Sequence, residues 1–158
     1  MSGLRIKYLK PALVAEHLAR ADALCAATGA RLTPLRRRVL ELVVRSGRPV
    51  GAYELLDQMR ACGHKGAPPT VYRALDFLQQ QGLVHRIAMA NAYVACSHPG
   101  CDHHALIFVC TECGNALELE ETQVKASVAA RAEAVGFRVP GQPIEVAGTC
   151  PLCQEGRP

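Results

Sequence analysis

Cysteine and histidine side chains are concentrated between Cys96 and Cys113. This stretch of eighteen residues, CSHPGCDHHALIFVCTEC, holds four of the eight cysteines and three of the six histidines of the chain. Thiolate sulfur and imidazole nitrogen are the two ligand types that proteins use most for Zn²⁺. The stretch therefore predicts metal binding.

Two cysteine pairs have the spacing of a closed zinc site. Cys110 and Cys113 form one C-x-x-C pair, and Cys150 and Cys153 form the other. Two intervening residues let both thiols reach one ion from a tight turn, and two such pairs complete a tetrahedral shell. The second pair, CPLC, also looks like a dithiol redox motif, but that motif begins a helix within a βαβ pattern. We therefore predict a structural zinc here.

The remaining candidate ligands lie on both sides of the middle of the chain. They are His85, Cys96, His98, Cys101, Asp102, His103, His104, Glu118 and Glu120. His85 and Cys96 fall on the two strands of a predicted hairpin, whereas His103 and Glu118 fall at the entry to the second half. A metal held by both sets would fix the angle between two domains, as a sensor requires.

The charge distribution also divides the chain into two halves. Residues 1–95 hold 14 Lys/Arg and 6 Asp/Glu, whereas residues 96–158 hold 4 and 8. A basic half of net charge +8 suits a polyanion such as nucleic acid, although a solvated basic face has the same composition. At 49% hydrophobic and 20% charged, the chain is not disordered. We expect no membrane span and no signal peptide, and eight cysteines in a cytoplasmic protein indicate metal or redox chemistry.

The first half predicts a winged helix. Helical spacing and stop signals predict helices over 12–27, 34–44, 51–61 and 67–81, followed by a hairpin over 83–88 and 92–95. Thr33 is a suitable N-cap and Pro34 suits the first helical position. In a winged helix the last helix enters the major groove and the hairpin touches the backbone. The N-terminal residues Thr70, Tyr72 and Arg73 are then the expected base contacts.

Three consecutive arginines open the second predicted helix. Arg36, Arg37 and Arg38 lie near the positive end of the helix dipole, where a cation is unfavourable by up to about 1 kcal/mol. An anion would offset this cost, so we predict phosphate contacts, with solvent as the alternative partner.

The second half predicts a small α/β domain. Strands are expected over 105–109, 115–119, 137–139 and 144–146, with a helix over 121–135. About 60 residues bury such an apolar strand and helix poorly, and metal or oligomerisation commonly supplies the missing stability. The fold class is therefore α+β: a winged-helix DNA-binding domain (1–95), a hinge (96–104) and a small α/β zinc-binding domain (105–158), to which the family resemblance given next assigns dimerisation.

Several motifs together resemble the ferric uptake regulator family, and most closely its zinc-sensing branch. They are TPLRRRVLEL (33–42), AYELL (52–56), PPTVYRALDFL (68–78), GLVHR (82–86), YVAC ending at Cys96, and the paired C-x-x-C. The resemblance covers roughly residues 16–153. It implies a homodimeric repressor of zinc-uptake genes that binds operator DNA when zinc-loaded, with two zinc ions per protomer.

The resemblance also assigns residues. It places structural zinc on the four paired cysteines and regulatory zinc on His85, Cys96, His103 and Glu118. It places DNA contacts on Tyr53 and Arg73. Iron-sensing members carry an HHDH run before the strand, whereas the corresponding run here is CDHH. His104, Cys101 and His98 therefore remain alternatives to His103.

Other functions have weaker support. A zinc deaminase requires H-x-E and P-C-x-x-C, which are missing, so we expect neither enzyme activity nor a small-molecule substrate. A zinc buffer without a DNA role does not explain the basic half. An iron or peroxide sensor of the same family remains open, because ligand spacing alone does not fix the metal.

Overall fold

The computed structural model describes residues 11–64, 67–100, 105–139 and 141–156. Contacts divide the chain into two compact units, Met1–Gly100 and Cys101–Pro158. The division falls inside the predicted 96–104 hinge. No helix in the described part of the chain combines the length and hydrophobicity needed to cross a membrane.

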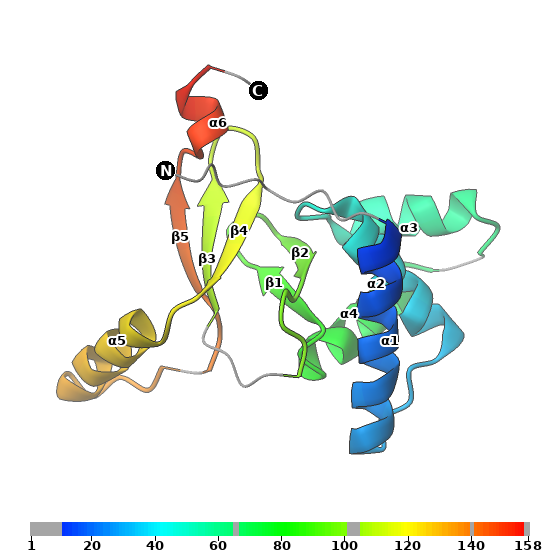
Figure 1. Cartoon of the computed structure of the whole chain (residues 1–158), viewed down its shortest axis with the longest axis horizontal. Helices are drawn as coiled ribbons and strands as arrows, with labels where there is room; N and C mark the ends of the chain where they lie inside the picture. The colour runs from blue at the N-terminus through cyan, green and yellow to red at the C-terminus, as the bar shows by residue number, and fades with distance from the viewer. Residues whose placement is uncertain (1–10, 65–66, 101–104, 140, 157–158) are drawn as a thin grey trace. The chain divides into compact units, whose positions relative to one another are not determined.

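The first unit is built from helices followed by a hairpin (Figure 1). The elements are α1 (Pro11–Thr28), α2 (Pro34–Ser46), α3 (Ala52–Ala61), α4 (Pro68–Gln80), β1 (Val84–Ile87) and β2 (Ala92–Ala95). Thr33 caps α2 as predicted, because its side chain accepts a hydrogen bond from the Arg36 N–H. At the other end, Gly47 takes the left-handed conformation that ends the helix.

The hairpin is the wing. β1 and β2 pair antiparallel, with His85 opposite Val94 and Arg86 opposite Tyr93. Val50 adds a bridge to Tyr93 through two backbone hydrogen bonds of 2.9 Å. The winged-helix prediction is confirmed.

An aliphatic core positions α4. Its buried face consists of Val71, Ala74, Leu75 and Leu78, which pack with the apolar faces of the other helices. This spacing is that of one helix face. Tyr72 and Arg73 consequently lie on the exposed side of the helix.

The second unit contains a three-stranded sheet. Its elements are β3 (Ala105–Cys110), β4 (Ala116–Glu120), α5 (Thr122–Ala134), β5 (Ile144–Gly148) and α6 (Pro151–Gln154). The strand order is β4-β3-β5, with β4 antiparallel and β5 parallel to the central strand. Parallel strands end at the same edge, so the carboxyl ends of β3 and β5 meet there, with Cys110 opposite Gly148.

The predicted strand over 137–139 is wrong. Gly136 adopts φ 77°, and Phe137 donates its N–H to Ala132 O at 2.8 Å, which ends α5 instead of starting a strand. The helix itself has no buried residue. In Figure 1, α5 extends away from the sheet of its own unit.

Candidate functional site

The sheet edge of the second unit brings the two C-x-x-C pairs together. The Sγ atoms of Cys110, Cys113, Cys150 and Cys153 all lie within 4.8 Å of one another. Cys113 Sγ and Cys150 Sγ are 3.8 Å apart. A tetrahedral zinc with Zn–S bonds of about 2.3 Å separates its sulfur ligands by about 3.8 Å. The four thiols therefore fit a closed zinc shell.

Local turns explain why the thiols converge. Cys110 is the last residue of β3, and the turn that follows closes when Gly114, at φ 71°, donates to Cys110 O at 3.0 Å. Cys150 is the N-cap of α6, whose first helical position is Pro151. Thr111 N donates to Gly148 O at 2.9 Å and ties the two turns together.

Two thiols of the cluster have pKa values that are shifted in opposite directions. Backbone hydrogen bonds from Cys113 and Cys150 lower the pKa of Cys110 to about 6. Side-chain hydrogen bonding with Cys150 raises the pKa of Cys153 to about 12. One thiolate therefore forms readily, whereas further negative charge in the cluster requires a cation.

Two of the predicted regulatory ligands lie on the wing. His85 is in β1, and Cys96 follows β2 and donates its N–H to Leu83 O at 3.0 Å. A His85 ring nitrogen and Cys96 Sγ lie within 4.8 Å of each other. The Cys96 side chain is fully buried. This pair is thus placed to share a metal ion.

Of the other regulatory candidates, the structure describes Glu118 and His98. Glu118 is half-buried in β4 of the second unit, opposite Ile107. His103, Cys101 and His104 lie outside the described residues. His98 is exposed, with its Nδ1 3.0 Å from Ser97 Oγ.

The predicted base-reading residues lie at the start of α3 and α4. Tyr53 is 68% exposed, and its ring meets that of Tyr72 edge-on, with centroids 6.5 Å apart. Edge-to-face pairs of this kind are favourable by about 0.5–1.5 kcal/mol. Pro68 and Pro69 open α4 and have no N–H, so recognition at this helix end depends on side chains such as Thr70 and Arg73.

Each of the three consecutive arginines has a partner within the first unit. Arg36 donates to Arg31 O at 2.7 Å and stacks over the Phe77 ring at 3.7 Å. Arg37 pairs with Asp22 at 3.3 Å. Arg38 pairs with Glu41 at 2.7 Å and donates to Cys62 Sγ at 3.1 Å.

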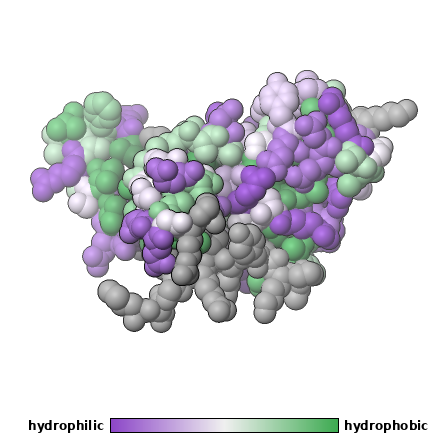
Figure 2. Space-filling model, turned by 90° about the horizontal axis from the view of Figure 1, so that it is seen from above, coloured by the Kyte–Doolittle hydropathy of each residue, from purple (hydrophilic) through white to green (hydrophobic). Residues whose placement is uncertain are grey.

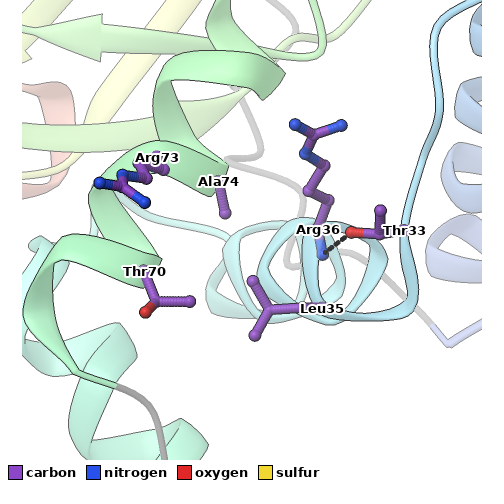
Figure 3. Close-up of a pocket in the computed structure, with 6 residues that line it drawn as sticks. All are labelled: Thr33, Leu35, Arg36, Thr70, Arg73 and Ala74. Atoms are coloured by element: carbon purple, nitrogen blue, oxygen red, sulfur yellow. Dashed lines mark hydrogen bonds between the residues drawn. The ribbon is translucent and has the colours of Figure 1, made fainter.

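A shallow pocket of about 190 Å³ separates the starts of α2 and α4. It is lined by Thr33, Leu35, Arg36, Thr70, Arg73 and Ala74. Figure 3 shows the Arg73 guanidinium directed away from Arg36, with Ala74 between them. Among the described residues, the Arg73 side chain has no hydrogen bond or ion pair, so its charge is available to a ligand.

Sequence reasoning missed His17. Its Nε2 lies 3.0 Å from Cys96 O. The buried residues Val14, Leu18, Ala21 and Cys25 recur at helical spacing, and His17 falls within that stripe. A polar residue on a buried helix face was the available signal.

Comparisons with known proteins agree on one family. The sequence profile of the ferric uptake regulator family matches residues 27–147. The chain is 39% identical over 143 residues to the zinc uptake regulation protein of Escherichia coli (strain K12), covering 89% of this chain and 82% of that protein. It is 33% identical over 131 residues to the zinc uptake regulation protein of Mycobacterium tuberculosis (strain H37Rv), covering 81% of this chain and 98% of that one.

A comparison with solved structures gives the same family. A zinc uptake regulator complexed with zinc and DNA is 38% identical, with a TM-score of 0.81 over 90% of this chain and 96% of that chain.

Proposed function

Because the chain belongs to the ferric uptake regulator family, we propose that it is a zinc-responsive transcriptional repressor. In this proposal the zinc-loaded homodimer binds operator DNA in the cytoplasm and represses zinc-uptake genes. The observation that supports this proposal most strongly is the 38% identity, over nearly the whole chain, to a zinc uptake regulator complexed with zinc and DNA.

The proposal assigns two zinc ions to each protomer. Structural zinc is held by Cys110, Cys113, Cys150 and Cys153, whose thiol spacing supports it. Regulatory zinc is held by four further ligands, namely His85, Cys96, His103 and Glu118. The burial of Cys96 beside His85 supports the wing half of that site.

Regulation follows from where the regulatory ligands are attached. The wing belongs to the first unit and Glu118 to the second. All four ligands can coordinate one ion only in one arrangement of the two units, so zinc selects that arrangement. Moving a two-state equilibrium from mostly one state to mostly the other requires about 5.5 kcal/mol of differential affinity.

The DNA-binding surface is the exposed side of α4 with the start of α3. Arg73 and Tyr72 on α4, with Tyr53 on α3, are proposed to contact bases, and Thr70 lies beside them. The exposed charge of Arg73, without a described partner, supports this role because arginine forms paired hydrogen bonds with guanine. Arg36, Arg37 and Arg38 are proposed to contact phosphates.

Homodimerisation is proposed through the second unit. Val135 and Phe137 are 74% and 73% exposed, and Val124 and Val128 on α5 are 39% exposed. Figure 2 shows hydrophobic (green) atoms at the left end of the view, where α5 lies. A second copy that covers these side chains would provide the burial that α5 lacks.

The decisive experiment measures DNA binding against free zinc. Randomised duplexes selected on zinc-loaded protein supply the operator probe, and fluorescence anisotropy then follows its binding with buffered zinc or with chelator. We expect binding to be lost in chelator and restored by zinc. Equal binding under both conditions contradicts the zinc-responsive function.

Repeating the titration with Fe²⁺ and Mn²⁺ identifies the responding metal. Restoration by Fe²⁺ at lower free concentration than Zn²⁺ would assign the chain to the iron sensors of the family. For the regulatory site, Cys96→Ser is expected to remove the zinc dependence. An unchanged dependence would exclude Cys96 as a ligand.

A further inference from the structure

Helix α1 holds the segment that leaves the wing. His17 Nε2 lies 3.0 Å from Cys96 O, and a carbonyl oxygen only accepts, so Nε2 carries the hydrogen of this bond. The other ring nitrogen, Nδ1, lies 3.3 Å from Leu13 O of the same helix. The ring is half-buried between the helix and the segment.

A second contact lies further along the same helix. A Cβ placed on Gly100 would come within 2.4 Å of Leu24 Cδ2, and Gly100 has φ +82°. Leu24 follows His17 by two helical turns on the same face of α1. Pro99, between the two contacts, is buried. The segment Cys96–Gly100 therefore runs along α1 and is fixed to it at both ends.

This attachment immobilises the backbone of Cys96. Its N–H is bonded to Leu83 O in the hairpin, and its C=O accepts from His17. The thiol attached to this backbone is fully buried beside His85. A ligand whose backbone is held at both polar groups loses less freedom when it binds an ion.

We propose that His17 is a positioning residue for the regulatory zinc site, and that α1 sets the place of the Cys96 thiol by docking the segment Cys96–Gly100. This inference rests on the proposed function, because it takes Cys96 as a regulatory ligand. It adds α1, which supplies no ligand, to the elements that determine the zinc response.

The first test replaces His17 by Leu in full-length protein. Protein left with one zinc after mild chelation is titrated with Zn²⁺ against a competing indicator. Loss of one hydrogen bond predicts about 3- to 10-fold weaker binding of the second zinc. Hydrogen exchange of the 96–100 segment should rise. His17→Gln, which keeps a donor of similar reach, should restore most of the affinity, and the exposed His64→Leu serves as the control.

The second test uses two glycines with the same backbone conformation. Gly100→Ala and Gly63→Ala carry similar strain, at φ +82° and +81°, but only the Gly100 side chain would meet another residue within 4 Å. Of these two variants, we expect only Gly100→Ala to weaken binding of the second zinc. This substitution removes no proposed ligand.

The possible outcomes distinguish failure of the positioning role of His17 from failure of the proposed regulatory site. If Cys96→Ser abolishes the second zinc while His17→Leu and Gly100→Ala bind it within twofold of wild type, the positioning role is overturned and the site stands. If Cys96→Ser leaves the second zinc unchanged, both the site and the inference are overturned. A lower melting temperature of His17→Leu with unchanged zinc affinity shows a purely structural residue and also overturns the inference.

Discussion

The Sγ atoms of Cys113 and Cys150 lie 3.8 Å apart, although 37 positions separate the two residues. The parallel pairing of β3 with β5 creates this proximity, because each strand delivers its C-x-x-C turn to the same edge of the sheet. Zinc on these thiols would connect the central strand to the end of the described chain. Its loss should therefore affect the fold of the whole second unit.

Replacing Cys113 by Ser is expected to remove one zinc per protomer and to destabilise the second unit by several kcal/mol. Structural zinc supplies about 10–16 kcal/mol of apparent binding free energy in small zinc domains, and this energy stabilises the fold. Metal analysis of purified protein and thermal unfolding test the expectation. Cys62→Ser is the matched control, since Cys62 is an exposed thiol of the first unit. Equal zinc content in both variants would contradict the structural site.

The pH dependence of zinc binding should steepen near pH 6. Cys110, with a pKa of about 6, is a thiolate above that pH, whereas Cys153, with a pKa of about 12, is protonated throughout the physiological range. Zinc binding therefore displaces a proton from Cys153 at any neutral pH, but from Cys110 only below about 6. The zinc affinity falls as the pH falls. Below about pH 6, the plot of log affinity against pH becomes steeper by about one unit, because the Cys110 proton must also leave.

Competition titrations of the structural site between about pH 5 and about pH 8 measure this slope. Since backbone N–H groups hold the Cys110 thiolate, a slope that stays constant through pH 6 would show that its pKa is not lowered.

Local patterns predicted most of the first unit. The Thr33–Pro34 cap, the helix over 67–81 and the hairpin each depend on neighbouring residues, and the structure has them where predicted. The strand over 137–139 was wrong because the cap of α5 uses the Phe137 N–H. β propensity alone does not reveal that competing hydrogen bond.

The two metal sites differ in how far the sequence could predict them. The four paired cysteines have diagnostic spacing, and the structure brings their thiols together. The contact between His17 and Cys96 joins residues 79 positions apart, and no local pattern encodes it. Likewise, the partners of Arg36, Arg37 and Arg38 come from tertiary packing.

Arg73→Ala is expected to weaken operator binding by about 1–3 kcal/mol, because arginine reads guanine through two hydrogen bonds. Binding to random duplexes should fall much less. Arg45→Ala removes the same charge from the last turn of α2, where Arg45 pairs with Glu41, and is the control. Anisotropy on both duplexes decides the matter, and equal losses for Arg73→Ala on both would make Arg73 a phosphate contact.

Arg37 and Arg38 should behave differently despite being neighbours. Arg37 and Asp22 are 45% and 48% exposed, so their ion pair contributes at most about 1 kcal/mol and Arg37 can turn to a phosphate. Arg38 and Glu41 are 27% and 18% exposed, and hydrogen bonding to Arg38 lowers the pKa of Glu41. Arg37→Ala should lower the salt slope of DNA binding by about one, whereas Arg38→Ala should lower the slope less and should also lower the melting temperature.

Salt titrations of both variants, with thermal unfolding beside them, measure the two effects. An unchanged slope for Arg38→Ala would exclude Arg38 from the phosphate contacts.

Phe137→Ser should weaken the homodimer. Phe137 is 73% exposed, in a unit whose α5 has no buried residue, and burial of a Phe side chain contributes about 1.5–3 kcal/mol per copy. Sedimentation equilibrium of the zinc-loaded protein measures the dimer constant. Met89→Ser, which removes a 57% exposed side chain from the wing turn, is the control. Equal dimer constants for the two variants would place the dimer interface away from the end of α5, because Phe137 lies near that end and Met89 lies in the other unit.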